Sequence, residues 1–420
     1  MTKKHSNTWK ELVQAKMSRR GFLRGVGVGA AAAATTGAVG GTVAASPGSI
    51  AAAATAVANA KVAGAAQVSS AIPFTPIDTD ATDDISLPEG FSYQVVIKRE
   101  DTFTPDGRIY GDNNDWMGWF PIDALEGGMS TTEGILAVNN EYFNSLFVAN
   151  YTGGEKTADQ VAAEKASVGV SHVHVRREGD EWVVVSDSEL ARRWDGTDPV
   201  EFGGPVAEEM GISEVIGTLA NCSGGNTPWF TNLSCEENYQ NYYGEDSQAG
   251  SSRYQWKEVD NADGQIPEHY GWVVETDPYT GRAVKRTAMG RFRHENVAIA
   301  IGASGKVVAY MGDDARNRPT YKFISNGTFD PNNREANADL LRDGTLYAAD
   351  FGSAEWIPVV WEGNEDLLGD PEQVDGYEIG SLGDVLTYAS PCALALGATP
   401  TDRPEDIEVH PGTGDTYILR

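Results

Sequence analysis

The chain has 420 residues, of which 61 are acidic and 32 are basic, giving a formal net charge of −29. Residues 1–60 carry seven Lys or Arg and one acid, so residues 61–420 hold 25 basic against 60 acidic side chains. This excess of negative charge disfavours binding to nucleic acid or anionic membranes, and it is typical of proteins that work in high salt, as in a halophile. The alternative is an acidic surface that holds divalent cations. Three cysteines exclude a disulfide scaffold.

The first 60 residues predict an export signal. Lysines lead into Ser18–Arg24 with its paired Arg19 and Arg20, and an uncharged run rich in Ala, Gly and Val continues to about Ala60. This pattern is typical of a twin-arginine signal, so the export machinery of that route is an expected partner and the protein is expected outside the cytoplasm. The run has too few bulky apolar residues for a stable membrane span. Because the route carries folded proteins, it also suggests a cofactor inserted before export.

Residues 61–84 are small, polar and acidic, and we expect a flexible leader there, followed by a single domain over residues 85–420. Within that domain, short apolar alternations are separated by Gly-centred turns. Single strands are predicted at 93–98, 134–139, 172–176 and 345–349, and hairpins at 167–177 with 181–186, 272–277 with 283–286, 297–301 with 307–311, and 407–410 with 416–419.

Repeated hairpins of this kind indicate an all-β fold. A β-propeller suits them best, because blades built from hairpins gather their loops at one end for a site, whereas a pair of β-sandwiches is the alternative. A helix is predicted only at about 157–166, apart from the signal region.

The stretch Asn221–Asn238, NCSGGNTPWFTNLSCEEN, is the most unusual in the domain. It places two cysteines, a Gly-Gly pair and two adjacent glutamates within eighteen residues. Thiolate beside carboxylate indicates a metal site, and the glycines allow the backbone to approach an ion. The competing interpretation is a disulfide between Cys222 and Cys235, and spacing alone does not separate the two.

Other candidates lie in loops next to predicted strands. Residues 111–116, with Asp115, form an oxygen-rich turn that suits calcium, although a surface Asx-turn is the commoner outcome. Glu141 ends a predicted strand. Glu295 precedes another, either as a ligand or as half of a surface ion pair.

The sequence Asp402-Arg403-Pro404-Glu405 sets a guanidinium beside a carboxylate. Arginine suits a phosphate, so phosphoryl transfer is one interpretation and a loop salt bridge is the other. A phosphate-binding Gly loop, a His-Glu-x-x-His zinc motif and a nucleophile elbow are all absent from the sequence, and six histidines make a His-rich metal site improbable.

Taken together, six motifs in this order resemble the PhoX-type alkaline phosphatases over about Leu87 to the C-terminus. Along the chain they are NNEY at 139–142, the stretch 221–238, RFRHE at 291–295, YMGDD at 310–314, YKFIS at 321–325 and DRPE at 402–405. The resemblance implies twin-arginine export, a six-bladed β-propeller, and hydrolysis of phosphate monoesters outside the cell with ferric iron (Fe3+) and calcium (Ca2+).

Carried over by position, the resemblance implies a role for each candidate. Cys235 would be the iron thiolate beside Glu236, with Glu295 and Glu405 as bridging carboxylates. Arg403 would hold the phosphate as the catalytic arginine. Calcium would be bound by Glu141 and Asp115.

The chain departs from the family pattern at three places. Asn140 stands where the family has His, and Phe230 stands where it has Gly, which suggests a narrower pocket. The sequence ends at Arg420, soon after DRPE, so either the last blade closes differently or the chain is a truncated form that lacks one ligand.

Two functions from different classes follow. The first is a secreted, monomeric, metal-dependent phosphatase acting on a small phosphate monoester. The second is a non-catalytic, calcium-stabilised propeller that acts as a binding or surface protein. A phosphodiesterase or a lactone-hydrolysing propeller is a third, weaker fit.

Overall fold

The computed structural model describes residues 74–79, 84–247, 252–259 and 264–419. The predicted export signal at 1–60 and most of the expected leader lie outside these residues. The chain forms two compact units, Met1–Tyr93 and Gln94–Arg420, and every helix and strand that the structure describes belongs to the second. No helix in the described part of the chain has the length and apolar character that crossing a bilayer requires.

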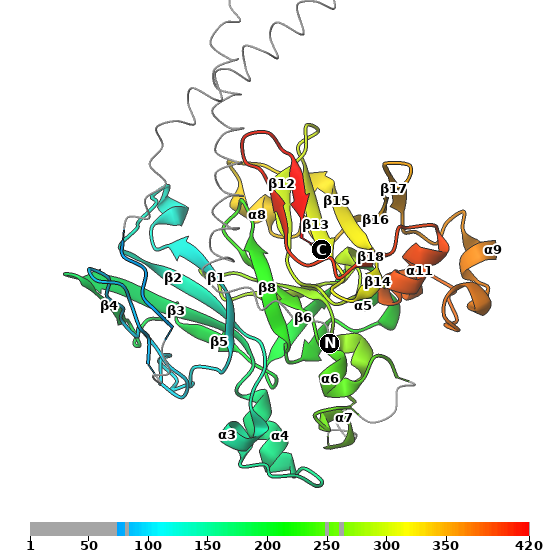
Figure 1. The fold of residues 1–420 in the computed structure, drawn as a ribbon. Helices are drawn as coiled ribbons and strands as arrows, with labels where there is room; N and C mark the ends of the chain where they lie inside the picture. The colour runs from blue at the N-terminus through cyan, green and yellow to red at the C-terminus, as the bar shows by residue number, and fades with distance from the viewer. Residues whose placement is uncertain (1–73, 80–83, 248–251, 260–263, 420) are drawn as a thin grey trace, which may run out of the picture. The chain divides into compact units, whose positions relative to one another are not determined.

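The second unit is mostly β, with three larger sheets that remain separate and do not close into a barrel (Figure 1). The first sheet has the order β1 (Asn114–Pro121), β2 (Glu133–Asn140), β3 (Gly169–Glu178), β4 (Glu181–Val184), with β5 (Arg192–Trp194) also paired to β3. The second has the order β7 (Glu214–Ile216), β6 (Pro199–Gly203), β11 (Ala283–Arg286), β10 (Val273–Thr276), β9 (Asn232–Glu236), β8 (Asn221–Asn226).

The third sheet has the order β12 (Ala298–Ile301), β13 (Lys306–Gly312), β15 (Thr320–Thr328), β16 (Gly344–Asp350), β17 (Glu355–Pro358). Two short pairs complete the strands: β14 (Arg316–Arg318) with β18 (Thr401–Asp402), and β19 (Ile407–Val409) with β20 (Thr416–Ile418). Pairing is antiparallel except between β6 and β11, which run parallel.

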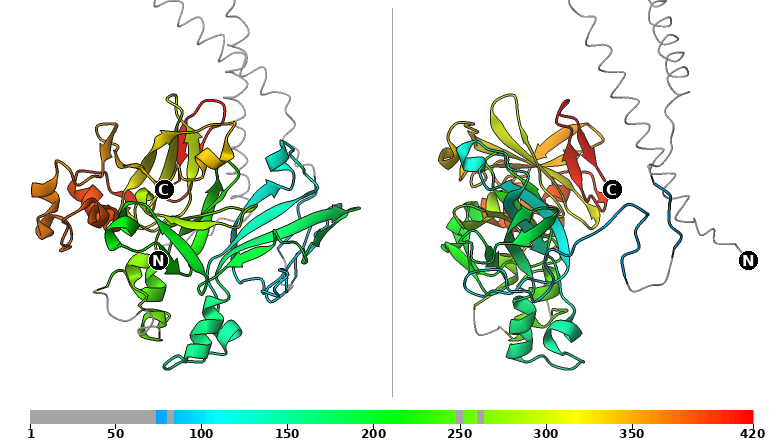
Figure 2. Two further views of the ribbon diagram at one scale, coloured as in Figure 1. Left: turned by 180° about the vertical axis from the view of Figure 1, so that it is seen from behind. Right: turned by 90° about the vertical axis from the view of Figure 1, so that its left-hand side faces the viewer.

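Helices in the described residues are short and lie in the connections, as both views of Figure 2 show. They are α3 (Ser145–Ala149), α4 (Ala158–Lys165), α5 (Pro205–Met210), α6 (Gln240–Tyr243), α7 (Trp256–Val259), α8 (Arg334–Asn337), α9 (Glu365–Leu368), α10 (Leu382–Thr387) and α11 (Ala389–Ala395), with 3-10 turns η1 (Ala124–Glu126), η2 (Pro267–His269), η3 (Thr287–Met289) and η4 (Pro371–Gln373). The predicted helix at 157–166 is α4, which begins with a capping box between Thr157 and Gln160.

All four predicted hairpins form, as β3–β4, β10–β11, β12–β13 and β19–β20. The glycine in each of these turns has a φ between 65° and 79°, a region that other residues rarely adopt: Gly179, Gly281, Gly305 and Gly414. The predicted strand at 93–98 is wrong. Its backbone is not in a sheet, and the side-chain amide of Gln94 instead exchanges two hydrogen bonds with the main chain of Trp182.

The main apolar cluster fills the space between the second and third sheets and reaches α10 and α11. It includes Val273 from the second sheet, Val307 and Phe323 from the third, and Leu386 from α10, each at most 3% exposed. At the edge of the second sheet, β8 contacts β1 and β2 of the first sheet and β12 of the third. The three sheets therefore meet around β8.

Candidate metal centre

The candidate site lies at one end of three antiparallel strand pairs. Asn114 at the start of β1 pairs with Asn140 at the end of β2, and Asn221 at the start of β8 pairs with Glu236 at the end of β9. The third pair is an isolated bridge between His294, before β12, and Asp313, after β13.

Each paired position is followed by a residue with a thiol or carboxylate. These residues are Asp115 with Glu141, Cys222 with Glu237, and Glu295 with Asp314. In an antiparallel pair, one strand begins where the other ends, so both residues of each couple lie at the same end of the strand pair. Because β8 contacts the other two sheets, these three strand ends lie close together.

Five of these residues form two groups that share the Cys222 thiol. Potential ligand atoms of Asp115, Glu141 and Cys222 lie within 4.8 Å of one another, and so do those of Cys222, Glu237 and Glu295. The Cys222 thiol donates to Oε1 of Glu295 at 3.4 Å. Glu141, Cys222 and Glu237 are each at most 7% exposed.

Burial and mutual repulsion shift the acids of these groups towards their neutral forms. Desolvation, with the charge of Asp115 and Glu295 nearby, raises the pKa of Glu141 to about 8. The same two causes raise the pKa of Glu237 to about 9, here with repulsion from Glu295 and Glu141. The pKa of Glu295 rises to about 7, mainly through burial, and the pKa of the Cys222 thiol also rises.

This donor set fits bound cations. Buried anionic groups are stable when they are paired or coordinate a metal, and the thiol and carboxylates of the two groups lack a salt bridge to a basic side chain among the described residues. A cation would replace their mutual repulsion by attraction and favour the charged form of each ligand. One soft thiolate among hard oxygen ligands suits iron, and the surrounding carboxylates suit calcium.

Arg403 lies at the rim of the same edge. It directly follows β18, has a φ of 54°, and donates to the carboxylate of Asp314. Its guanidinium also lies 3.0 Å from Glu405. The side chain remains 54% exposed, so Asp314 directs a guanidinium that a ligand from solvent can reach.

The structure brings together some of the predicted ligands and separates others. Asp115, Glu141 and Glu295 belong to the two groups, whereas Cys235, Glu236 and Glu405 belong to neither. Cys235 is fully buried within the main apolar cluster. All three cysteines are free, which excludes the disulfide between Cys222 and Cys235.

Glu236 faces a different environment from the groups, although it is a neighbour of Glu237. Its carboxylate accepts from Nζ of Lys285 at 2.7 Å, from the Thr218 hydroxyl and from three backbone N–H groups. Glu405 lies at the rim, where it is 41% exposed and adds to the charge that raises the pKa of Glu295.

Asn140 and Phe230, the two positions where the chain departs from the family pattern, lie in different parts of the second unit. Asn140 is fully buried, and its side-chain oxygen accepts from Ser171 and Arg193, so it supports the strand end before Glu141. Phe230 lies in the turn between β8 and β9, at the end opposite to Cys222. A phenylalanine there does not narrow the site, so that expectation is wrong.

Sequence reasoning did not select Cys222, Glu237 and Asp314 as site residues. The signal that identifies them is the strand boundary, because all three sit immediately after a paired strand end, as Glu141 does. Finding them from the sequence requires the β8–β9 register, which decides which cysteine of the motif lies at the edge.

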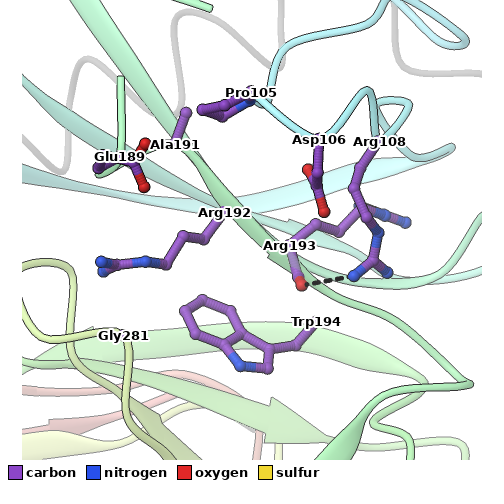
Figure 3. Close-up of a pocket in the computed structure, with 9 residues that line it drawn as sticks. All are labelled: Pro105, Asp106, Arg108, Glu189, Ala191, Arg192, Arg193, Trp194 and Gly281. Atoms are coloured by element: carbon purple, nitrogen blue, oxygen red, sulfur yellow. Dashed lines mark hydrogen bonds between the residues drawn. The ribbon is translucent and has the colours of Figure 1, made fainter. Parts of the chain in front are cut away.

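A cavity elsewhere in the unit does not contain any of these ligands. It has a volume of about 340 Å³, is lined by Arg108, Arg192 and Trp194 among others, and lies against β5 (Figure 3). Arg108 is held there by Asp195 and Asp198. This cavity is called the β5 cavity below.

Comparison with known proteins decides the family. Residues 72–420 match the family described as alkaline phosphatase PhoX. The chain belongs to the PhoX alkaline phosphatase family. The resemblance inferred from the six motifs is thereby confirmed, and this PhoX member is a phosphoric monoester hydrolase rather than a non-catalytic binding protein. No curated protein matches the chain.

A solved structure is similar to the chain over most of its length. It is Pseudomonas fluorescens PhoX in complex with vanadate, a transition state analogue. The two are 32% identical, with a TM-score of 0.70, and the match covers 82% of this chain and 67% of that chain.

Proposed function

We propose that this PhoX member hydrolyses phosphate monoesters with metal ions held by Asp115, Glu141, Cys222, Glu237 and Glu295. The observation that carries the proposal is the meeting of these side chains at one end of the three strand pairs, where buried carboxylates raise one another's pKa values and have no salt bridge to a basic side chain among the described residues. Cys222 takes the place that sequence reasoning gave to Cys235. Ferric iron beside the thiolate and calcium at the oxygen-rich positions match the donor types.

When bound, such ions act as Lewis acids that polarise a phosphoryl oxygen and help to activate an oxygen nucleophile. The protein positions the substrate through Arg403, whose exposed guanidinium suits the bidentate geometry of a phosphoryl group. Asp314 orients that guanidinium from the end of β13. Because Asp314 neighbours the carboxylate groups, it sets Arg403 beside them, and charge that develops on the phosphoryl oxygens is neutralised there.

The likeness to a vanadate-bound relative supports this assignment. Vanadate mimics the five-coordinate arrangement of a transferring phosphoryl group, and in that relative it is a transition state analogue. We therefore expect vanadate to inhibit this enzyme in competition with substrate, since a site complementary to the transition state binds its analogue tightly.

We also propose a six-bladed propeller over residues 85–420, export by the twin-arginine route, and a monomer that works outside the cytoplasm, in high salt. Separate, mainly antiparallel sheets that meet around β8 and present their strand ends to one site support the propeller. The acidic composition supports the high-salt setting. The paired arginines, Arg19 and Arg20, support the export route.

Elemental analysis and a phosphatase assay on one purified sample test the proposal. We expect bound iron and calcium, hydrolysis of p-nitrophenyl phosphate, and loss of turnover after chelation that returned metals restore. Arg403→Ala should lower kcat/KM by about 100-fold or more, because it removes a donor aimed at developing charge. The matched control is Arg316→Ala, an exposed arginine on the paired strand β14, which should change kcat/KM less than about twofold. A metal-replete sample without phosphomonoesterase activity would overturn the proposal.

A further inference from the structure

A second cavity borders the proposed site and is lined by different residues from the β5 cavity. It has a volume of about 260 Å³. Three of its lining residues are close chain neighbours of site residues: Tyr239 follows Glu237 by two positions, Arg293 precedes Glu295 by two, and Asp313 adjoins Asp314. The charge of Arg293 also acts on Glu237. We call it the rim cavity.

The rim cavity has as many acidic as basic side chains. Its three arginines are Arg291, Arg293 and Arg318, and its three acids are Glu245, Asp313 and Asp375. Arg293 pairs with Glu245 at 2.6 Å. The charge of Arg318 acts on Asp313 and lowers its pKa, against the larger effect of burial. A wall of balanced charge does not favour a second strongly charged group on the ligand.

Both donors and acceptors remain available around the rim cavity. Among the described residues, Arg318 donates one side-chain hydrogen bond, to Oγ of Ser390 at 3.1 Å, out of the five N–H groups that a guanidinium carries. Asp313 lines the cavity, and its Oδ2 is buried without a hydrogen bond of normal geometry among the described residues, while the nearby Ser390 hydroxyl lowers the pKa of that carboxyl. Buried polar atoms without partners are costly, so an occupant that both donates and accepts is favoured here.

An aromatic pair forms another part of the wall. The rings of Tyr377 and Tyr388 stack with centroids 4.2 Å apart and an interplanar angle of 21°. Both rings are only partly buried. Such rings offer a flat apolar surface beside polar groups, which suits a ligand with C–H faces and hydroxyl edges.

The rim cavity lies close to the guanidinium proposed to hold the phosphate. Arg318 on β14 pairs with Thr401 of β18, and Arg403 follows two residues later. At about 3.3 Å per residue, those two positions are separated along the strand by roughly 7 Å. Arg318 also bonds to Ser390 in α11, so β14, β18 and α11 lie together, as Figure 1 shows.

We propose that the rim cavity binds the alcohol portion of a hydroxyl-rich phosphate monoester, that is, a sugar or polyol phosphate. Hydroxyl groups donate and accept, as this wall requires, whereas a second phosphate or carboxylate only accepts. Arg318 supplies donors to the hydroxyls and Tyr388 supplies the ring surface. The inference rests on the proposed function, since the phosphate of the same molecule binds to the Arg403 guanidinium.

The test compares two substrates that differ only in the alcohol portion, glucose 6-phosphate and ethyl phosphate. The quantity measured is the ratio of their kcat/KM values in the metal-loaded enzyme. We expect the wild type to prefer glucose 6-phosphate, and we expect Arg318→Gln to lower the ratio by about tenfold or more, as the loss of hydrogen bonds from a charged donor does. Tyr388→Leu should lower it by several-fold.

Arg192→Gln provides the matched control. It removes an arginine of the β5 cavity (Figure 3), and we expect the ratio to stay within about twofold of wild type. Thermal melts identify any variant that fails to fold, and if Arg318→Gln is such a variant, the Tyr388→Leu ratio decides the question.

Four results would overturn the inference: no preference in the wild type, equal losses on both substrates in the folded variants, an unchanged ratio in those variants, or an equal fall in Arg192→Gln. If the metal-loaded wild type hydrolyses neither substrate, the proposed function itself fails and the inference falls with it.

Discussion

Two neighbouring glutamates, Glu236 and Glu237, show how differently this protein treats a buried carboxylate. Both are at most 5% exposed. Glu236, the last residue of β9, is paired with Lys285 and accepts three backbone hydrogen bonds. Glu237, one residue later, lies near Glu141 and Glu295, and their charges help to raise its pKa to about 9.

The comparison separates structural acids from candidate ligands. Inside the second sheet, a second buried pair joins Glu275 to Arg286 at 2.7 Å, so the sheet compensates its own carboxylates. Glu141, Glu237 and Glu295, which lie next to strand ends, have no such salt bridge among the described residues. A buried acid without a basic partner is retained at a cost to stability, and this is the usual condition of a site that awaits a cation.

Replacing each glutamate by glutamine in turn tests most directly whether the two carboxylates have different roles. Glu237→Gln should lower kcat/KM for p-nitrophenyl phosphate by at least about 100-fold and reduce the bound metal, because it removes a ligand. Its metal-free form should melt no lower than wild type, since it removes repulsion. Activity, elemental analysis and thermal melts of both forms measure these effects.

Glu236→Gln is the matched control, with the same chemical change one residue away. It leaves the buried Lys285 charge without its counter-ion, so the free energy of unfolding should fall by about 3 kcal/mol. Metal content per folded molecule should stay close to wild type. Equal loss of metal in both variants would show that the separation of the two roles is wrong.

The two cysteines of the same motif offer a second contrast. Cys222→Ser should lower kcat/KM by about 10- to 100-fold and weaken metal binding, because a hydroxyl is a poorer ligand than a thiolate. Cys235→Ser should keep the metal and change kcat/KM only slightly. Its cost is stability, about 1–3 kcal/mol, because the new hydroxyl enters an apolar cluster.

Activity and elemental analysis of the two serine variants distinguish these outcomes. If Cys235→Ser loses the metal and Cys222→Ser keeps it, the thiol ligand is Cys235, as its adjacent carboxylates in the sequence suggest. The position of Cys222 at a strand end would then not identify the ligand.

The pH dependence of the metal-free enzyme tests the repulsion itself. In the unfolded chain Glu237 titrates near 4.5, whereas in the folded protein its pKa is about 9, so the folded state binds more protons between these values. Stability therefore falls as pH rises through this window. Glu141 and Glu295 act in the same direction, with pKa values of about 8 and about 7.

We expect the melting temperature of the chelated protein to decrease from about pH 5 to about pH 9. The metal-loaded protein should show a smaller decrease, because bound cations keep the carboxylates charged at little cost. Chelated Glu237→Gln, which lacks one of the titrating groups, should also show a smaller decrease than chelated wild type. A chelated wild type whose melting temperature rises over this range would contradict the assignment.

Much of the fold followed from local patterns. Apolar alternation and turn glycines predicted the four hairpins, and strand ends predicted Glu141 and Glu295 as neighbours of the site. The strand at 93–98 failed because alternation alone does not supply a backbone partner, and here a glutamine side chain provides the hydrogen bonds.

The choice between the two cysteines needed information that spacing does not carry. Cys222 is at the edge and Cys235 in the core because of the β8–β9 register, including its irregularity between Asn221 and Gly224. The role of Glu236 depends on Lys285, a residue 49 positions away that reaches it within the second sheet. Long-range pairing of this kind decides which carboxylate of an adjacent pair is free to bind a metal.

Phe230 gives the smallest expected effect and tests the geometry from the far end of β8. Its φ of 60° is a region that costs a residue with a side chain about 1–2 kcal/mol, while its ring packs against the apolar cluster that includes Phe120. Phe230→Gly relieves the strain but loses the packing, so the free energy of unfolding should change by no more than about 1 kcal/mol. Phe230→Ala keeps the strain and loses most of the packing, so it should be less stable than the glycine variant. Because Cys222 and Asn226, the last residue of β8, are separated by four steps of about 3.3 Å, the turn begins roughly 13 Å from Cys222, and kcat/KM should stay within about twofold in both variants. A tenfold change in either would mean that the turn reaches the metal site, contrary to the observed register.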